Sequence, residues 1–138
     1  MAYEIVWEPE GVLVQFSAQV TGRELINSAR QMQGDSRFDE GRYVINDFTA
    51  VTGHELSEEP LVELSALHYG AYASHPNCRI VFVTTDAALG ALVKSVLMAP
   101  EMASYQIEVF PSVSDARDWL ESQPDLHVMS NVMGFRIR

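Results

Sequence analysis

Residues 79–86, RIVFVTTD, decide the fold class of this chain. The run from Ile80 to Val83 is wholly apolar and lacks the alternation of a half-buried strand. Such a short run is typical of a central strand buried on both faces, as in the parallel sheets of α/β proteins. Asp86 is a suitable N-cap for a helix that continues toward Pro100. The stretch therefore predicts one strand-to-helix unit of a layered α/β domain.

The same unit recurs before and after this stretch. Residues 43–48 (YVINDF) predict a strand, and residues 57–74 predict the helix that follows it after a polar loop over residues 49–56. Residues 105–110 (YQIEVF) predict another strand, followed by a helix over residues 112–123. Because strands alternate with helices, we expect right-handed crossovers and a mostly parallel sheet.

The amino-terminal segment predicts a β-hairpin and then a helix. Residues 3–8 and 12–16 both alternate apolar and polar side chains, on either side of a turn that contains Pro9 and Gly11. Thr21 and Glu24 have the spacing of a capping box, which marks a helix start. The predicted order is β-β-α-β-α-β-α-β-α. This describes a single layered α/β domain over residues 1–124, with an antiparallel hairpin beside a mostly parallel sheet.

Residues 125–138 do not fit this alternation. Arg136 and Arg138 make their end basic, and the segment holds many apolar side chains. These are Leu126, Val128, Met129, Val132, Met133, Phe135 and Ile137. We expect this tail to pack on its own domain, with a contact in a homodimer as the alternative.

Composition restricts the choice of partners and compartment. The 138 residues suit one domain, and the net charge of -10 disfavours nucleic acid and anionic lipid as partners. A basic protein partner remains compatible with this charge, although acidity also serves solubility alone. The single cysteine, Cys78, is expected to be a partly buried hydrophobe, and it allows no intrachain disulfide. The chain shows neither a signal peptide nor an apolar run long enough to span a bilayer, so we expect a cytoplasmic protein.

Motifs for catalysis, metal or cofactor binding are not found in the sequence. It contains no GxGxxG or GxxxxGK[ST] loop, no HExxH and no GxSxG turn. The four histidines, His54, His68, His75 and His127, come without a cysteine pair. We expect no cofactor, no metal and no enzymatic activity. An enzyme whose residues converge only in space remains an alternative.

The segments that follow two neighbouring strands form the one candidate surface for a partner or ligand. In a parallel sheet, both segments emerge at the carboxyl edge, where helix N-termini and ligands meet. The candidate residues are Thr49, Thr52, His54, Glu55, Ser57, Thr84, Thr85 and Asp86. Their hydroxyl, imidazole and backbone N–H groups can bind an anion or a partner loop. Ordinary helix caps and turns, among them a cap by Ser57, are the alternative interpretation.

The layout, with the stretches TGRELINSAR, RYVINDFTAVTGHELSEE and RIVFVTTD, resembles the SpoIIAA-like branch of the STAS superfamily (sulphate transporter and anti-sigma factor antagonist) over about residues 3–122. The resemblance implies a non-enzymatic switch that binds a kinase or another regulator. Family members carry a phosphorylatable serine in a D-S-[ST]-G-like motif, where the helix after the third strand starts. Residues 53–57 (GHELS) occupy that place without the motif, and His54 or Glu55 falls where the Asp-Ser pair would be. One hypothesis is that Glu55 mimics the phosphorylated state.

The topology is also similar to lipid-binding CRAL-TRIO-type domains. This similarity implies an apolar pocket between sheet and helices. Candidate lining residues are Tyr69, Tyr72, Phe82, Met98 and Met102, although core packing explains each of them as well. The sequence thus predicts a non-catalytic regulatory or protein-interaction module, with a binder of a small hydrophobic or anionic ligand as the alternative.

Overall fold

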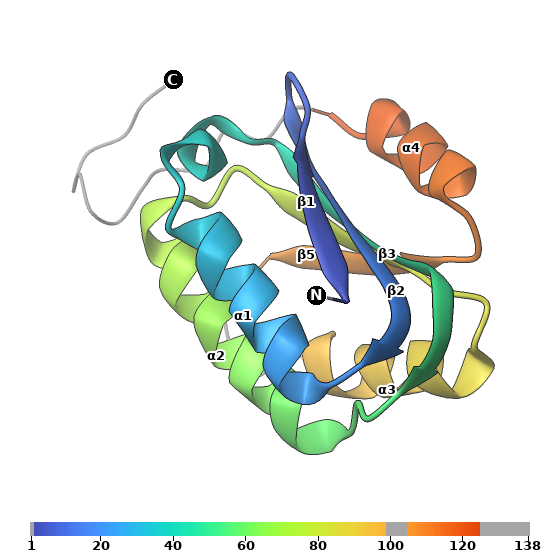
Figure 1. Ribbon diagram of the computed structural model, residues 1–138. Helices are drawn as coiled ribbons and strands as arrows, with labels where there is room; N and C mark the ends of the chain where they lie inside the picture. Colours follow the sequence, from blue (N-terminus) through green and yellow to red (C-terminus); the bar gives the residue numbers. More distant parts are fainter. Residues whose placement is uncertain (1, 99–104, 125–138) are drawn as a thin grey trace.

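Five strands form one sheet, and their spatial order is the order of the chain (Figure 1). The computed structural model describes residues 2–98 and 105–124, so the expected packing of the tail 125–138 lies outside the described residues. The strands are β1 (Tyr3–Trp7), β2 (Gly11–Val20), β3 (Tyr43–His54), β4 (Arg79–Val83) and β5 (Gln106–Phe110). β1 pairs antiparallel with β2, and every other pair is parallel. The predicted hairpin and mostly parallel sheet are confirmed.

Helices cover both faces of this sheet. They are α1 (Gly22–Gln33), α2 (Glu58–Ser74), α3 (Ala87–Leu97) and α4 (Val113–Ser122), with a short 3-10 helix at Ser36–Glu40. Figure 1 shows α1, α2 and α3 on one face and α4 on the other. The predicted element order is therefore confirmed, and the 3-10 helix is an addition to it. None of the helices over residues 2–98 and 105–124 is long and apolar enough to cross a bilayer.

Strand β4 is an interior strand of the sheet, between β3 and β5. All five of its residues are buried, as the unbroken apolar run predicts. Ile80 and Phe82 pack into the larger cluster, beneath α1, α2 and α3, while Val81 and Val83 pack with Ala116 of α4. The alternation of side chains along one strand thus joins both layers of helices to the same sheet.

The start of α1 is fixed by the predicted capping box. The Thr21 hydroxyl accepts a hydrogen bond from the Glu24 N–H (3.2 Å), and the Glu24 carboxylate accepts one from the Thr21 N–H (3.0 Å). At the next residue, Gly22, a Cβ would lie 2.8 Å from the Pro60 Cβ in the first turn of α2. A glycine here allows the two helices to begin side by side.

Strand β3 is longer than the sequence predicts. It continues to His54, so the prediction of a loop over residues 49–56 is wrong for residues 49–54. The cause is its neighbour β2, which runs ten residues and offers hydrogen-bond partners as far as Val20. Two register shifts interrupt this pairing, and between them Ala18 adopts a φ of 57°. Such bulges let Thr49–His54 remain paired although their side chains do not alternate between apolar and polar.

Candidate functional site

The carboxyl ends of β3 and β4 bring the two predicted segments together. Six of the eight candidate residues line a cleft of about 90 Å³ between the end of β3 and the connection from β4 to α3. They are Thr49, Thr52, His54, Thr84, Thr85 and Asp86. The parallel neighbours β3 and β4 place both segments at one edge, as the predicted topology requires.

Asp86 organises the α3 side of this cleft. One of its carboxylate oxygens, Oδ1, accepts hydrogen bonds from the N–H groups of Ala88 (3.0 Å) and Leu89 (3.2 Å), which confirms it as the N-cap of α3. Its own N–H donates to the Thr84 hydroxyl at 3.0 Å. The hydrogen bond from the Leu89 backbone, followed by one from His54, lowers the pKa of the Asp86 carboxyl. Asp86 is therefore a fixed negative charge at the mouth of the cleft.

His54 connects the end of β3 to Asp86. Its Nδ1 accepts a hydrogen bond from the Leu56 N–H at 3.1 Å, so in neutral His54 the ring proton lies on Nε2. That Nε2 lies 3.3 Å from Asp86 Oδ2 and donates to it. Both ring nitrogens are therefore engaged within the protein. A general base needs a free nitrogen lone pair, and this imidazole offers none unless the Leu56 hydrogen bond breaks.

The threonines of the cleft differ in the hydrogen bonds that their hydroxyl groups form. The Thr49 hydroxyl donates to Asp47 Oδ1 at 2.7 Å, and the same oxygen accepts from the Thr49 N–H at 2.9 Å. Thr84 is buried, and its oxygen already accepts from Asp86. Thr52 and Thr85 are exposed. Thr49 is exposed as well, but its hydroxyl is bonded to Asp47, so in the described part of the chain Thr52 and Thr85 are the exposed threonines of the cleft whose hydroxyls form no hydrogen bond within the protein.

Glu55 and Ser57 lie outside the cleft. The Glu55 N–H donates to the Val20 carbonyl (2.8 Å), and its side chain lines a separate groove of about 380 Å³ between α1 and α2. Ser57 takes the predicted N-cap position of α2, but its hydroxyl forms no capping hydrogen bond. Its φ of -139° and ψ of -172° give an extended backbone at this position. Pro60 has no N–H, which removes the N3 donor that a capping serine usually binds.

Metal ligands do not gather in the described part of the chain. Over residues 2–98 and 105–124 no group of three or more His, Cys, Asp or Glu side chains lies close enough to hold a metal ion. Cys78 is more deeply buried than expected, at 1% exposure, and burial raises the pKa of its thiol to about 12. A thiol of this kind is a core hydrophobe and a poor nucleophile.

The space between the sheet and helices α1 and α2 is nearly filled. The cavity there has a volume of about 10 Å³, enough for about one water molecule, and Ser28, Asn46 and His68 contribute polar groups to its wall. Burial lowers the pKa of His68 to about 4, so this imidazole is neutral at pH 7. A cavity of this size has no room for a small hydrophobic ligand.

The residues predicted to line an apolar pocket lie apart. Phe82 is in the core and Tyr72 packs edge-on against Tyr105, with ring centroids 5.3 Å apart. Tyr69 and Met98 are exposed on the outer surface. Met102 lies outside the described residues.

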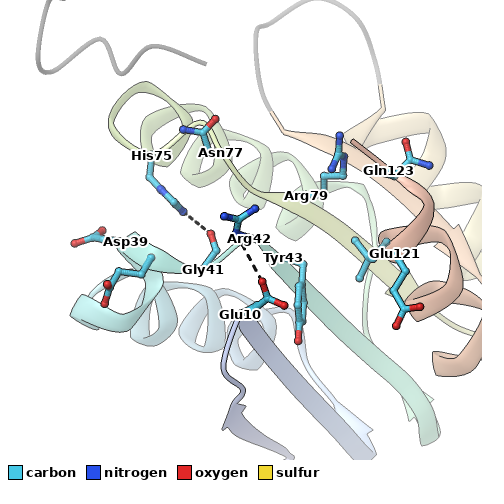
Figure 2. Close-up of a pocket in the computed structure, with 12 residues that line it drawn as sticks. Glu10, Asp39, Gly41, Arg42, Tyr43, His75, Asn77, Arg79, Glu121 and Gln123 are labelled. Atoms are coloured by element: carbon cyan, nitrogen blue, oxygen red, sulfur yellow. Dashed lines mark hydrogen bonds and ion pairs between the residues drawn. The ribbon is translucent and has the colours of Figure 1, made fainter. Parts of the chain in front are cut away.

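A larger hollow, of about 480 Å³, lies at the opposite edge of the sheet and was missed by sequence reasoning (Figure 2). It is formed where β3 and β4 begin, next to the carboxyl-terminal ends of α2 and α4. We call it the amino-edge basin. The available signal was Arg79, a charged residue at the first position of an otherwise apolar buried strand.

The fold is similar to two solved structures. SpoIIAA, an anti-sigma factor antagonist in its unphosphorylated form, superposes with a TM-score of 0.60 at 8% identity, over 88% of this chain and all of that one. An uncharacterised DUF3478-family protein with a SpoIIAA-like fold, from Shewanella loihica PV-4, superposes with a TM-score of 0.51 at 14% identity, over 86% of this chain and 92% of that one. No family model and no curated protein matches the sequence. The expected SpoIIAA-like fold is thus confirmed.

Proposed function

We propose that this protein is a non-catalytic regulatory module that binds a protein partner through its carboxyl-edge surface. This surface comprises the eight residues predicted above: Thr49, Thr52, His54, Glu55, Ser57, Thr84, Thr85 and Asp86. The observation that carries the proposal is the pairing of His54 with Asp86, which uses both ring nitrogens of the histidine. The pair holds two segments in place but leaves no free base, which suits a recognition surface better than a catalytic site.

The size of the cleft favours a macromolecular partner over a small molecule. Small-molecule pockets usually measure about 300–1,000 Å³. The cleft at the carboxyl edge has about 90 Å³, enough to receive one side chain of a partner. The likeness to SpoIIAA, an anti-sigma factor antagonist, supports a regulatory role for the same fold.

The charge around this surface favours a basic partner. Glu55, Glu59 and Glu63 line the adjoining groove, and Asp86 stands at the cleft itself. Arg23 and Arg30 also line that groove, and Arg30 pairs with Glu63 at 3.4 Å. The net charge of the chain is -10, so a basic surface would be attracted before contact.

Affinity capture with matched variants tests this proposal. Thr52→Arg and Thr85→Arg each place a long cation on an exposed position of the surface, whereas Ser95→Arg adds the same charge to α3, away from it. We expect wild type and Ser95→Arg to retain the same partner from native-host lysate, and the two threonine variants to lose it. Raising the salt concentration should weaken the capture. Equal capture by all four proteins would refute this surface.

Regulation through Glu55 is a separate part of the proposal. Its carboxylate is exposed, as is the hydroxyl of Ser57, which no capping bond engages. We propose that Glu55 supplies the negative charge that a phosphoserine provides elsewhere in this fold. Intact mass should then show no phosphate on the wild-type protein, and Glu55→Ser should reduce partner binding. Unchanged binding by Glu55→Ser would exclude this role for Glu55.

A homodimer is a second candidate, because large apolar side chains are exposed on α2 and at the end of α3. Over residues 2–98 and 105–124 these are Val62 and Tyr69 of α2, each 51% exposed, and Met98 at the end of α3, at 39%. Native mass spectrometry of wild type and of Tyr69→Glu tests it. A wild-type dimer that Tyr69→Glu dissociates would support a contact through α2, and a wild-type monomer would exclude it.

A further inference from the structure

Arg79 is a buried charge at the wall of the amino-edge basin, at the edge of the sheet opposite the proposed partner surface. Arg79 is 8% exposed, and its Nε donates a hydrogen bond to the side-chain oxygen of Gln106 at 3.2 Å. In the part of the chain that the structure describes, no carboxylate forms an ion pair with this guanidinium. Buried arginines are rarely found without an acidic partner. An amide oxygen accepts a hydrogen bond but does not neutralise the charge, so the basin offers a site for an anionic group.

The rim of the same basin is negative. It carries the carboxylates of Glu10, Asp39, Glu40 and Glu121, and within residues 2–98 and 105–124 Glu10 is the one of these that forms an ion pair with an arginine, at 3.9 Å from Arg42. In Figure 2, Arg79 lies on the same side of the basin as Glu121 and Gln123, while Asp39 and His75 lie on the far side. The carboxyl-terminal ends of α2 and α4 also adjoin the basin, and helix C-termini carry partial negative charge. A ligand with only negative charge would therefore be repelled at the rim before it reached Arg79.

We propose that the amino-edge basin binds a small zwitterion of the basic amino acid type. Its carboxylate would accept a forked pair of hydrogen bonds from the Arg79 guanidinium, and its cationic group would face the carboxylates of the rim. Two parallel bonds from a guanidinium are the preferred recognition of a carboxylate. The volume of about 480 Å³ lies within the usual range for small-ligand sites.

Nuclear magnetic resonance of the full chain tests this site with glycyl-L-lysine as the probe. Two further probes each lack one of the required charges: cadaverine has no carboxylate, and succinate has no cation. We expect glycyl-L-lysine to shift the amide signals of Gly41, His75 and Gln123 in a saturable manner. Cadaverine and succinate should each bind at least about tenfold more weakly than glycyl-L-lysine. Equal binding of cadaverine, or shifts confined to other surfaces, would overturn the proposal.

Variants separate the two halves of the site. Arg79→Gln should weaken glycyl-L-lysine about tenfold or more, and Arg79→Lys should restore only part of the loss, because an ammonium lacks the forked geometry. Arg23→Gln removes an exposed arginine outside the basin and should leave binding unchanged. Since Arg79 is buried, its variants must first show a folded amide spectrum. If the Arg79 variants do not fold, Glu121→Gln at an exposed position decides the test. It should weaken the binding of glycyl-L-lysine but not the binding of succinate. Unaltered binding of glycyl-L-lysine would overturn the proposal.

Discussion

Arg117 of α4 forms a two-pronged ion pair with Glu8, 109 residues earlier in the chain, through hydrogen bonds of 3.0 and 2.7 Å. The Tyr43 hydroxyl donates to the same carboxylate. The pair joins α4 to the turn between β1 and β2. The hydrogen bonds from Arg117 lower the pKa of Glu8, while burial, followed by the bond to Glu8, raises the pKa of Tyr43 to about 12. This contact holds α4, the one helix on its face of the sheet in the described ranges, against the hairpin.

Removing either partner of this pair should therefore destabilise the domain. We expect Arg117→Gln and Glu8→Gln each to lower the free energy of unfolding by about 1–2 kcal/mol, allowing for the solvent that screens Arg117. Urea unfolding of the two single variants and the double variant measures the coupling. The surface pair of Arg30 and Glu63, at 3.4 Å, is the matched control, and its coupling should be near zero. Equal coupling in the two cycles would contradict the role assigned to Glu8 and Arg117.

His68 should make the protein less stable in mildly acidic solution. Burial lowers its pKa to about 4 from the ordinary value of 6.5, so the unfolded chain binds a proton more readily than the folded one. The loss of stability caused by His68 is absent above pH 6.5. It grows as the pH falls toward 4 and reaches about 2 kcal/mol at pH 5. Urea unfolding at pH 7.5 and pH 5 measures this loss.

The matched variants are His68→Phe, which retains an aromatic ring beside Tyr105, and His75→Gln at the end of α2. The pH 5 loss should shrink strongly in His68→Phe and persist in His75→Gln. A loss that is the same in all three proteins would assign it to other groups.

Two glycines should respond to alanine in opposite directions. A Cβ at Gly22 would lie 2.8 Å from the Pro60 Cβ, whereas one at Gly70, inside α2, would meet nothing within 4 Å. Gly70→Ala should stabilise the protein by about 0.5–1 kcal/mol, because alanine is the better helix former and restricts the unfolded chain. Gly22→Ala should destabilise it by about 1–3 kcal/mol through overpacking. Thermal unfolding of both variants checks the signs, and a stabilised Gly22→Ala would show that the helices can separate without cost.

The fold was largely predictable because its signals are local. The apolar run in β4, the capping box of Thr21 and the N-cap Asp86 each depend on residues close together in the chain. The extension of β3 to His54 depends instead on hydrogen bonds to β2, more than thirty residues earlier, and residues 49–54 show no alternation of apolar and polar side chains that would predict a strand. Ser57 shows the same limitation, since its capping hydrogen bond fails although the residue type and position are suitable.

The sequence indicates the candidate site at the carboxyl edge of the sheet more clearly than the basin at the amino edge. The topology alone brings the ends of β3 and β4 together, so the residues of the carboxyl-edge cleft could be named before their contacts were known. The amino-edge basin is assembled from the starts of β3 and β4 and the ends of α2 and α4. A lone arginine at the start of a strand does not reveal that its side chain bonds to Gln106, because that pairing depends on the register of β4 with β5.

The proton position on His54 provides a direct test of the carboxyl-edge geometry. Because Nδ1 accepts from the Leu56 N–H, the neutral ring should be protonated at Nε2, which long-range ¹H–¹⁵N spectra of the imidazole report. Asp86→Asn retains a side-chain oxygen that can cap α3 but removes the charge facing His54, so the domain should stay folded and the neutral ring should keep its proton on Nε2. Asp86→Ala should in addition cost about 1 kcal/mol of stability through loss of the cap. A neutral ring protonated at Nδ1 would contradict the arrangement, because His54 would then be free to act as a base through Nε2.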